Sequence, residues 1–549
     1  MSYRQSIALT ALFFAVAPMA AFGQNAQTIL PYDSPAISLL RSIYLEQGKD
    51  PLSAAGPFSI GELRMMLDKI DRSTLSPAGM RAYDAILAAI QTKPAAAPMA
   101  LGFAAHPSTS LEGYFHTNPD PAQTQWQDGY NQRLPMVAVP MDIWIGDHIY
   151  GDFDLALSQT HDGVNPLLVP QNYLNWTTNL DLLDDEIPRR AFVAAGGDDW
   201  SFSIGRDRFS WGNGQTGDLF LSDAPDFQDF ARLTLYWPSI KYTALWIMLY
   251  YNLDNYRSPI WGSDGGNTVT TNDTYPRNLF VHRLDFAFFN RLSFGVSEGI
   301  LIGGIQPDLV YFNPLIIFHD LFRWGHASTI FSIDASYNPW KYFELYGQVA
   351  SNKITVPYEL LRYGGAAATQ PDSTAYLGGL RARIPIWQGY LDTGGEAVLV
   401  GPWMYLRENQ LISDEWWRWT NSNVAGSPQW VSAPLGYFTG PDAVVYSAWV
   451  GYDVPGMFTV GLDYQNIAQG QQTFDTTYSE GAAAIALQAP SGIPEYRNII
   501  HLNGSVDVFP FLRVATDLYW IWVSNFSHVS GAQMSDFQAT VSLTAHTNW

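Results

Sequence analysis

The sequence predicts a mainly β protein: a transmembrane outer-membrane β-barrel of about 18 antiparallel strands, preceded by a small helical bundle. The first observation behind this prediction is the last stretch of the chain. From Phe537 to the C-terminal Trp549, apolar and polar residues alternate, with Phe537, Val541 and Leu543 on one parity. In a barrel wall the apolar parity faces lipid, the polar parity faces the lumen, and about 10 residues cross the bilayer. The other interpretation of this strand is the edge of a secreted β-sandwich.

The second observation is the recurrence of such alternating runs from residue 99 to the C-terminus. Phe458 to Gln465 and Leu512 to Trp522 are clear examples, and turn signals such as Asn338-Pro339 separate the runs. About 450 residues at roughly 25 per strand and connection give about 18 strands, an even number as bacterial barrels require. The longer polar connections, including 409–431, are expected to be outward-facing loops.

Composition supports a membrane barrel and excludes other classes of protein. The chain has 549 residues, with 29 Lys+Arg against 51 Asp+Glu, and a formal net charge of −22. This balance argues against a nucleic-acid partner, because few cations are present to neutralise phosphates. Charged residues are 15 %, against about 25 % in a typical soluble domain. Aromatic residues also reach 15 %, which aromatic girdles at the two membrane interfaces would explain.

Residues 1–23 have the features of a signal peptide that is removed on export. Arg4 supplies the positive charge, Ile7 to Val16 the short apolar core, and Ala21 and Gly23 the small residues before a cut at Gln24. The apolar core is too short to span a membrane. We therefore expect an exported outer-membrane protein, which the barrel-assembly machinery folds after reading the terminal aromatic residue, Trp549.

Residues 24–98 have a helical period and predict a periplasmic helical bundle and linker, before a barrel over 99–549. Three helix starts carry this prediction: Ser34, the possible capping box Ser59 with Glu62, and Ser76 followed by Pro77. Lys93 to Pro98 (KPAAAP) is the predicted linker. The bundle is interpreted either as a packing plug or as a docking module.

Five segments match, in the same order, motifs of a known family. They are Gly205 to Gly214 (GRDRFSWGNG), His282 to Phe286 with Arg291 to Glu298, Leu345 to Gln348 (LYGQ), Glu396 to Tyr405 (EAVLVGPWMY), and Pro434 to Gly436 with Gly440 to Asp442 (PLG and GPD). The chain thus resembles the capsule-assembly Wzi-like outer-membrane protein family. That resemblance implies a barrel with a periplasmic helical bundle that acts as a surface lectin for capsular polysaccharide, with no chemical step.

Two groups of residues are candidates for the functional site. The candidate carbohydrate-binding residues are Asp414, Glu415, Trp416, Trp417, Arg418 and Trp419. They combine aromatic platforms, which stack on sugar CH faces, with polar partners for hydroxyls. The other interpretation of this group is an interfacial aromatic belt with a snorkelling Arg.

The candidate family-motif and lumen residues are Arg206, Asp207, Arg208, Trp211 and Gly214. They either line the lumen or form a structural turn with paired charges. If the glycan is anionic, Arg206, Arg208 and Arg418 are expected to matter more for binding than the net charge of the chain suggests.

The predicted function is non-enzymatic binding or anchoring of a capsular or surface polysaccharide by a monomer embedded in outer-membrane lipid. An outer-membrane porin or diffusion channel for small solutes is the alternative, and an outer-membrane enzyme acting on lipid or glycan is a further one. No catalytic residue, cofactor or metal is predicted, because scattered histidines lack ligand spacing and no nucleophile elbow or phosphate-binding loop is present.

Overall fold

The computed structural model describes most of the chain, and the fold is given for those residues. They are 25–90, 101–120, 126–160, 172–178, 183–184, 188–250, 277–313, 316–318, 326–353, 371–407, 410–420, 429–476 and 488–546. The signal peptide predicted at 1–23, the linker predicted at Lys93 to Pro98, and Trp549 lie outside them.

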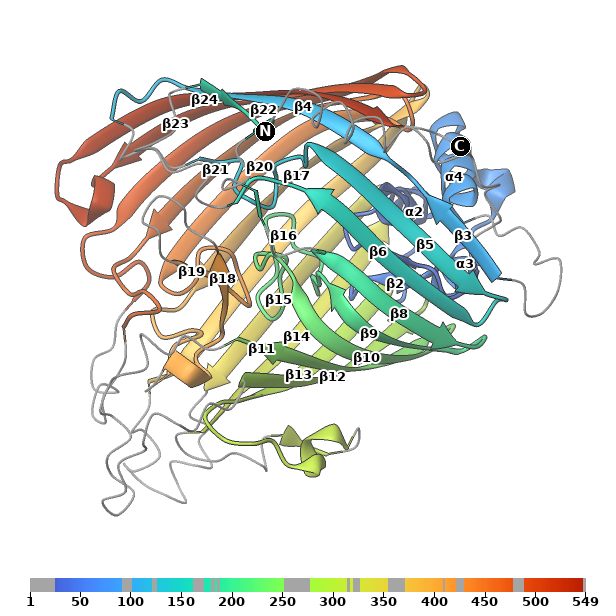
Figure 1. Cartoon of the computed structure of the whole chain (residues 1–549), viewed down its shortest axis with the longest axis horizontal. Coiled ribbons are helices and arrows are strands. Elements are labelled where there is room, and N and C mark those ends of the chain that lie inside the picture. Colours follow the sequence, from blue (N-terminus) through green and yellow to red (C-terminus); the bar gives the residue numbers. More distant parts are fainter. Residues whose placement is uncertain are drawn as a thin grey trace, which may run out of the picture.

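The strands close into one antiparallel barrel of 18 strands within the described part of the chain, which confirms the predicted fold class (Figure 1). The wall strands are β3 (Leu101–Ala105), β4 (Ser108–His116), β5 (Val137–Ile145), β6 (Ile149–Leu157), β8 (Arg190–Gly196), β9 (Trp200–Asp207), β10 (Gln228–Trp237), β11 (Ile240–Leu249), β12 (Arg277–Phe288), β13 (Leu292–Ile302), β14 (Ala327–Trp340), β15 (Phe343–Lys353), β16 (Ser373–Ile386), β17 (Gly389–Val400), β20 (Ala443–Val454), β21 (Phe458–Gln469), β22 (Glu495–Phe509), β23 (Leu512–Ser524) and β24 (Gln533–His546). β3 and β4 are two parts of one wall strand, and the pairing of β4 with β24 closes the barrel. The short β7 (Asn172–Leu174) adds to β4.

The two parities of the wall strands face different surroundings. On β24, Asp536, Gln538 and Thr540 are buried, whereas Val541 and Leu543 are exposed. The apolar parity therefore faces outward and the polar parity faces the lumen, as the alternation predicts. Large aromatic side chains, including Phe289, Trp340 and Trp387, are strongly exposed beside the short turns at one end of the barrel. This is the placement expected of an interfacial girdle.

Three helices precede the wall, as the sequence predicts. They are α2 (Pro35–Gln47), α3 (Ile60–Leu67) and α4 (Pro77–Ile90), and the two short strands β1 (Ile29–Leu30) and β2 (Phe58–Ser59) pair with each other. The Oγ atom of Ser59 accepts a hydrogen bond from the amide of Glu62 at 3.2 Å, so Ser59 caps α3. α2 ends at Gly48 in the left-handed conformation, which glycine adopts without strain. No helix in the described ranges is both long and apolar enough to span a membrane.

The helical bundle lies at the end of the barrel that carries the short turns (Figure 1). The amide of Asp50 donates to the carbonyl of Asn290 in the β12–β13 turn at 2.8 Å, and the amide of Tyr342 in the β14–β15 turn donates to Leu45 at 2.7 Å. The apolar faces of the helices share one core with Tyr390 of β17. The bundle is thus packed on the barrel rather than separate from it.

Candidate functional site

The segment between α2 and α3 enters the lumen and is held there by side chains of the wall. Lys241 of β11 donates from Nζ to the carbonyl of Ala55 at 2.9 Å, and its Nζ lies 2.5 Å from Oε1 of Glu62. Trp211 is fully buried, and its indole Nε1 donates to the carbonyl of Gly56 at 2.9 Å. The family-motif residue Trp211 therefore braces the N-terminal segment.

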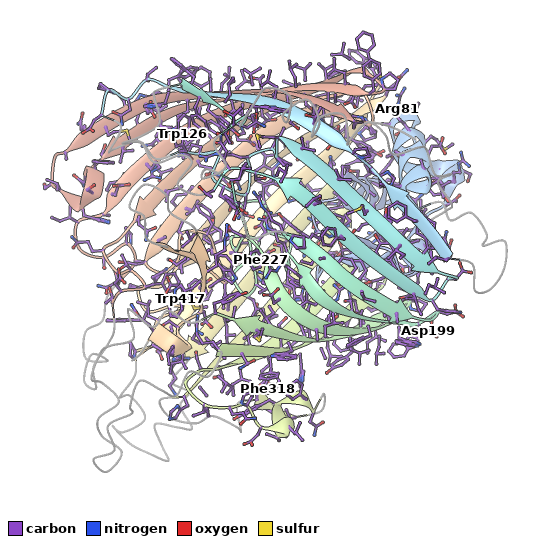
Figure 2. The ribbon with its side chains drawn as sticks, viewed as in Figure 1. Arg81, Trp126, Asp199, Phe227, Phe318 and Trp417 are labelled. Atoms are coloured by element: carbon purple, nitrogen blue, oxygen red, sulfur yellow. The ribbon has the colours of Figure 1, made fainter. Side chains whose placement is uncertain are left out.

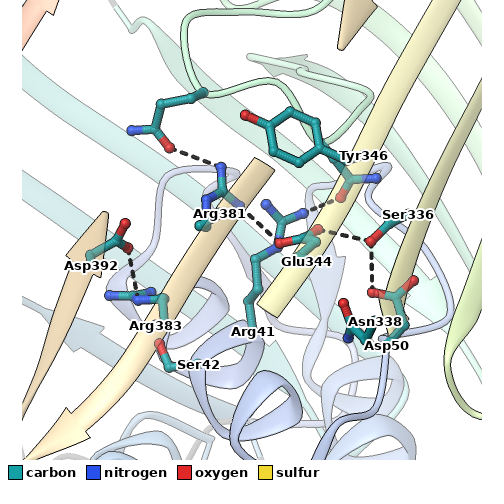
Figure 3. Close-up of polar contacts among 12 residues, drawn as sticks. Arg41, Ser42, Asp50, Ser336, Asn338, Glu344, Tyr346, Arg381, Arg383 and Asp392 are labelled. Carbon is teal, nitrogen blue, oxygen red and sulfur yellow. Dashed lines mark hydrogen bonds and ion pairs between the residues drawn. The ribbon is translucent and has the colours of Figure 1, made fainter. Parts of the chain in front are cut away.

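Polar and charged side chains of β14 to β17 lie beside α2 and the segment that follows it (Figure 3). The Oγ atom of Ser336 lies within hydrogen-bond distance of both Glu344, at 2.8 Å, and Asp50, at 3.1 Å, and Arg383 pairs with Asp392 at 2.9 Å. A cavity of about 440 Å³ with a mixed polar and apolar lining remains between α2, the loop after β9, and strands β16 and β17. The helical bundle is therefore held to the wall by hydrogen bonds and by the ion pair of Lys241 with Glu62, as well as by the apolar core.

The two predicted arginines of the family motif are already engaged with neighbouring groups. Arg206 pairs with Asp229 of β10 at 2.7 Å, and Arg208 donates to the carbonyl of Pro225 at 3.2 Å. Asp207 pairs with Arg190 of β8 at 3.1 Å. Two of these contacts join β9 to its neighbours β10 and β8, and the third lies within the loop between β9 and β10.

Asp218 organises the same loop around Gly214. Its Oδ1 accepts from the amide of Gly214 at 3.2 Å, and its Oδ2 accepts from the hydroxyl of Ser210 at 2.6 Å. Burial raises the pKa of Asp218 to about 7, although both hydrogen bonds act to lower it. The predicted motif residue Gly214 thus donates a backbone hydrogen bond within a closed turn.

The predicted carbohydrate-binding segment forms a hairpin folded into the barrel. Its strands are β18 (Glu415–Thr420) and β19 (Gln429–Pro434), and Figure 1 shows them within the outline of the wall. Trp416 and Trp417 are 1 % and 3 % exposed. The ring of Trp416 meets Phe227 edge-on at 5.4 Å, and the guanidinium of Arg277 lies 4.3 Å from the ring centre of Trp417.

Arg418 joins the hairpin to three other loops. Its Nε lies 2.6 Å from Oδ2 of Asp226, its Nη2 lies 2.9 Å from Oδ2 of Asp184, and its guanidinium lies 5.0 Å from the ring centre of Tyr130. Arg418 is 1 % exposed. Its charge is therefore compensated by two buried carboxylates.

The two acidic residues at the start of the segment are also buried. Asp414 accepts a hydrogen bond from Nδ2 of Asn352 at 2.5 Å, and burial raises its pKa to about 6. Burial likewise raises the pKa of Glu415 to about 7. The structure describes the backbone of Trp419 but not its side chain. The five described side chains of this segment are packed inside the barrel, which does not fit an interfacial belt and leaves little surface for a glycan.

A partly exposed aromatic group lies on the lumen side of β4 at the end with the long loops. This group, the Trp126 cluster, is Tyr114, His116, Trp126, Arg133 and Tyr173. The ring of Trp126 stands edge-on to Tyr173 at 5.5 Å and to His116 at 5.2 Å. The guanidinium of Arg133 lies 5.6 Å from the ring centre of Tyr173. Trp126, Arg133 and Tyr173 are each partly exposed, so the cluster offers accessible rings beside a cation.

Only part of this cluster has a signal in the local sequence. The short segment Trp126 to Arg133 (WQDGYNQR) combines aromatic, acidic and basic residues, as Asp414 to Trp419 does. Tyr173 comes from a distant segment and joins only because β7 pairs with β4. Tyr114 and Tyr173 consequently stack at 4.3 Å.

The lumen wall over β21 to β23 is half-exposed, unlike the wall over β10 to β15, where lumen side chains are buried. His501 lies at its centre, 3.4 Å from Asp463 and 3.0 Å from Asp517, and stacks on Tyr519 at 4.2 Å. The lumen is therefore packed on one side and accessible to water on the other.

Comparisons with known proteins place the fold. No protein-family model matches the chain, and no curated protein matches it by sequence. Among solved structures, it is similar to Wzi of Escherichia coli, an outer-membrane protein involved in group 1 capsule assembly and described as a carbohydrate-binding β-barrel. The TM-score is 0.57 at 12 % identity, over 94 % of this chain and 98 % of that one.

Weaker similarities extend to other outer-membrane proteins. OccK5 (OpdH) of Pseudomonas aeruginosa matches with a TM-score of 0.40 at 10 % identity, over 81 % of this chain and 98 % of that one. OpdK of the same organism matches with a TM-score of 0.38 at 12 % identity, over 82 % and 100 %. The chain has the β-barrel fold of the outer-membrane protein Wzi, as its sequence motifs predict.

Proposed function

We propose that this barrel binds or anchors a capsular or other surface polysaccharide at the cell surface and carries out no chemical step. The observation that carries the proposal is the Trp126 cluster, whose partly exposed rings lie beside Arg133 at the long-loop end of a Wzi-like lumen. Long loops face outward and short turns face the periplasm in outer-membrane barrels. On this basis the cluster lies on the outer side, and the helical bundle closes the periplasmic end as a plug.

The chemistry of the cluster suits a glycan. Sugar rings present CH faces that stack on aromatic rings, and their hydroxyl or carboxylate oxygens accept from a guanidinium. The structure of Wzi, described as carbohydrate-binding, supports the same assignment. The buried hairpin residues Trp416, Trp417 and Arg418 then support the loops around the site instead of contacting the glycan.

The test is equilibrium binding of the refolded, detergent-solubilised barrel to the surface polysaccharide of its own host. Saturable binding that falls about tenfold or more in Trp126→Ala, and equally in Arg133→Gln if the glycan is anionic, supports the proposal. Trp387→Ala is the matched control, because this Trp is 84 % exposed beside a short turn at the opposite end. Absence of binding by the unaltered protein would overturn the proposal.

A second candidate function is a diffusion channel, which the half-exposed wall of β21 to β23 favours. Asp463 and Asp517 flank the only histidine of that described wall, His501, so the strip is acidic overall and would prefer cations. Conductance in planar bilayers tests this directly. Stable cation-selective conductance that changes in Asp517→Asn would support the channel, whereas a closed lumen with saturable glycan binding would support the lectin.

A further inference from the structure

The connection between β13 and β14 folds back over the outside of the barrel. We call its residues 303–318 the outer lobe, of which 303–313 and 316–318 are described. Val281 of β12 belongs to the lumen core, so its neighbours Phe280 and His282 point outward. The ring of Phe280 lies 4.9 Å from Phe312, and the ring of His282 lies 4.3 Å from Phe318. Figure 2 shows Phe318 outside the strands of the wall.

The outer lobe covers wall positions that would otherwise face lipid. Phe280 is 2 % exposed and Ile300 is fully buried, although both have the outward parity. His282 pairs in register with Glu298 of β13, so two ionisable side chains stand next to each other on the outward face. Polar side chains are unfavourable on the lipid face of a barrel, least so near the interface. The lobe therefore covers His282, whose ring packs against Phe318.

The position along the strand assigns the lobe to one leaflet. β12 runs from Arg277 at the long-loop end to Phe288 at the short-turn end, and about 9–11 residues of a tilted strand cross the bilayer. Phe280 and His282 lie in the first half of that span, counted from the long-loop end. A lobe packed on them lies at the depth of the leaflet on that side.

The lobe exposes three large apolar side chains, alongside the polar Gln306, Asp308 and Asn313. Leu309 is 87 % exposed, Ile317 60 % and Phe312 46 %. On the wall itself, outward side chains of β14 such as Phe331 are also exposed, as expected of a lipid-facing surface. Three large exposed apolar side chains at the depth of a leaflet suit acyl chains better than water.

We propose that the outer lobe is a membrane-inserted element whose ligand is the acyl chains of the leaflet at the long-loop end. Leu309, Phe312 and Ile317 contact the lipid, and Phe318 closes the lobe over His282. This role is independent of glycan binding, because the lobe lies outside the wall and the Trp126 cluster lies inside it.

The chain has no cysteine, so a single introduced cysteine can carry one environment-sensitive fluorophore. Leu309→Cys and Ile317→Cys place the label on the lobe. Leu462→Cys, on the exposed outward parity of β21, is the lipid-facing control, and Thr473→Cys, in an exposed connection, is the aqueous control. All four sites are exposed, so no buried contact is removed, and heat-modifiable migration confirms that each variant is folded.

The labelled barrels are reconstituted into phosphatidylcholine vesicles that carry spin labels on the acyl chains. We expect quenching at Leu309 and Ile317 to be at least half of that at Leu462, with protection from aqueous iodide. Quenching as weak as at Thr473 would overturn the proposal. Self-quenching that grows with the protein-to-lipid ratio, without acyl-chain quenching, would also overturn it and would assign the surface to a second copy of the chain.

Discussion

The indole Nε1 of Trp211 donates a hydrogen bond to the carbonyl of Gly56 at 2.9 Å and so joins the loop after β9 to the N-terminal plug. Residues 55 and 211 also form an isolated antiparallel bridge. Because Trp211 is fully buried, its side chain both packs against the segment between α2 and α3 and hydrogen-bonds to it.

Replacement of Trp211 is expected to loosen the plug. Trp211→Phe leaves the Gly56 carbonyl without this donor and should lower the free energy of unfolding by about 1–3 kcal/mol, and Trp211→Ala by about 3–5 kcal/mol. Urea unfolding followed by heat-modifiable migration measures the effect. Trp387→Ala, at a strongly exposed site, serves as the control. Equal stability of Trp211→Ala and the control would contradict this assignment.

Removal of Arg418 is expected to release the loops that it joins. Arg418→Ala leaves Asp184 and Asp226 buried without their shared cation, which should lower stability by about 3–5 kcal/mol. The exposed pair of Arg72 with Asp84 is the matched control, and Arg72→Ala should change stability by no more than about 1 kcal/mol. Thermal unfolding measures the stability of both variants. Similar losses of stability in both would show that the buried ion pairs of Arg418 contribute no more than the exposed pair of Arg72.

A methyl group at Gly295 is expected to disrupt an ion-pair cluster in the lumen. The Cβ would meet Nη2 of Arg283, which lies 2.7 Å from Asp285 and whose Nη1 lies 2.6 Å from Asp334. Gly295→Ala should therefore lower stability by about 3 kcal/mol or more. At Gly378 a Cβ meets nothing within 4 Å, so Gly378→Ala should be neutral or slightly stabilising. Equal effects of the two substitutions would refute the argument.

The raised pKa of Asp218 predicts lower stability at neutral than at acidic pH. The pKa is about 7 in the folded protein, against an ordinary 3.8, so the folded state binds more protons between these values. Through this group alone, the free energy of unfolding should fall as pH rises from about 4 to about 7, by up to about 1.4 kcal/mol per pH unit.

Asp218→Asn should flatten the pH profile, because it removes the titrating group and keeps a similar shape. Denaturant unfolding at several pH values measures this. Asp147→Asn, at an exposed site in the β5–β6 turn, should leave the profile unchanged. A profile of Asp218→Asn as steep as that of the unaltered protein would show that other buried carboxyls, such as Glu415, dominate.

The sequence by itself determined the class of fold. Strand period is local, so the alternation over Phe537 to Leu543 was enough to assign the lipid-facing and lumen-facing parities of the wall. The cap at Ser59 and the start of α4 at Pro77 were likewise readable, because capping involves residues three or four positions apart. Chain length divided by the usual strand-and-turn length gave the strand number.

Only the tertiary structure decided what the polar and aromatic residues do. The sequence of Asp414 to Arg418 is compatible with an exposed loop and with a buried one. In the structure this hairpin folds into the barrel, where Arg418 pairs with acidic residues of two other loops. Tyr173 reaches Trp126 only through the pairing of β7 with β4. Long-range contacts of this kind depend on which loops enter the lumen and which fold outside, and no short-range pattern encodes that choice.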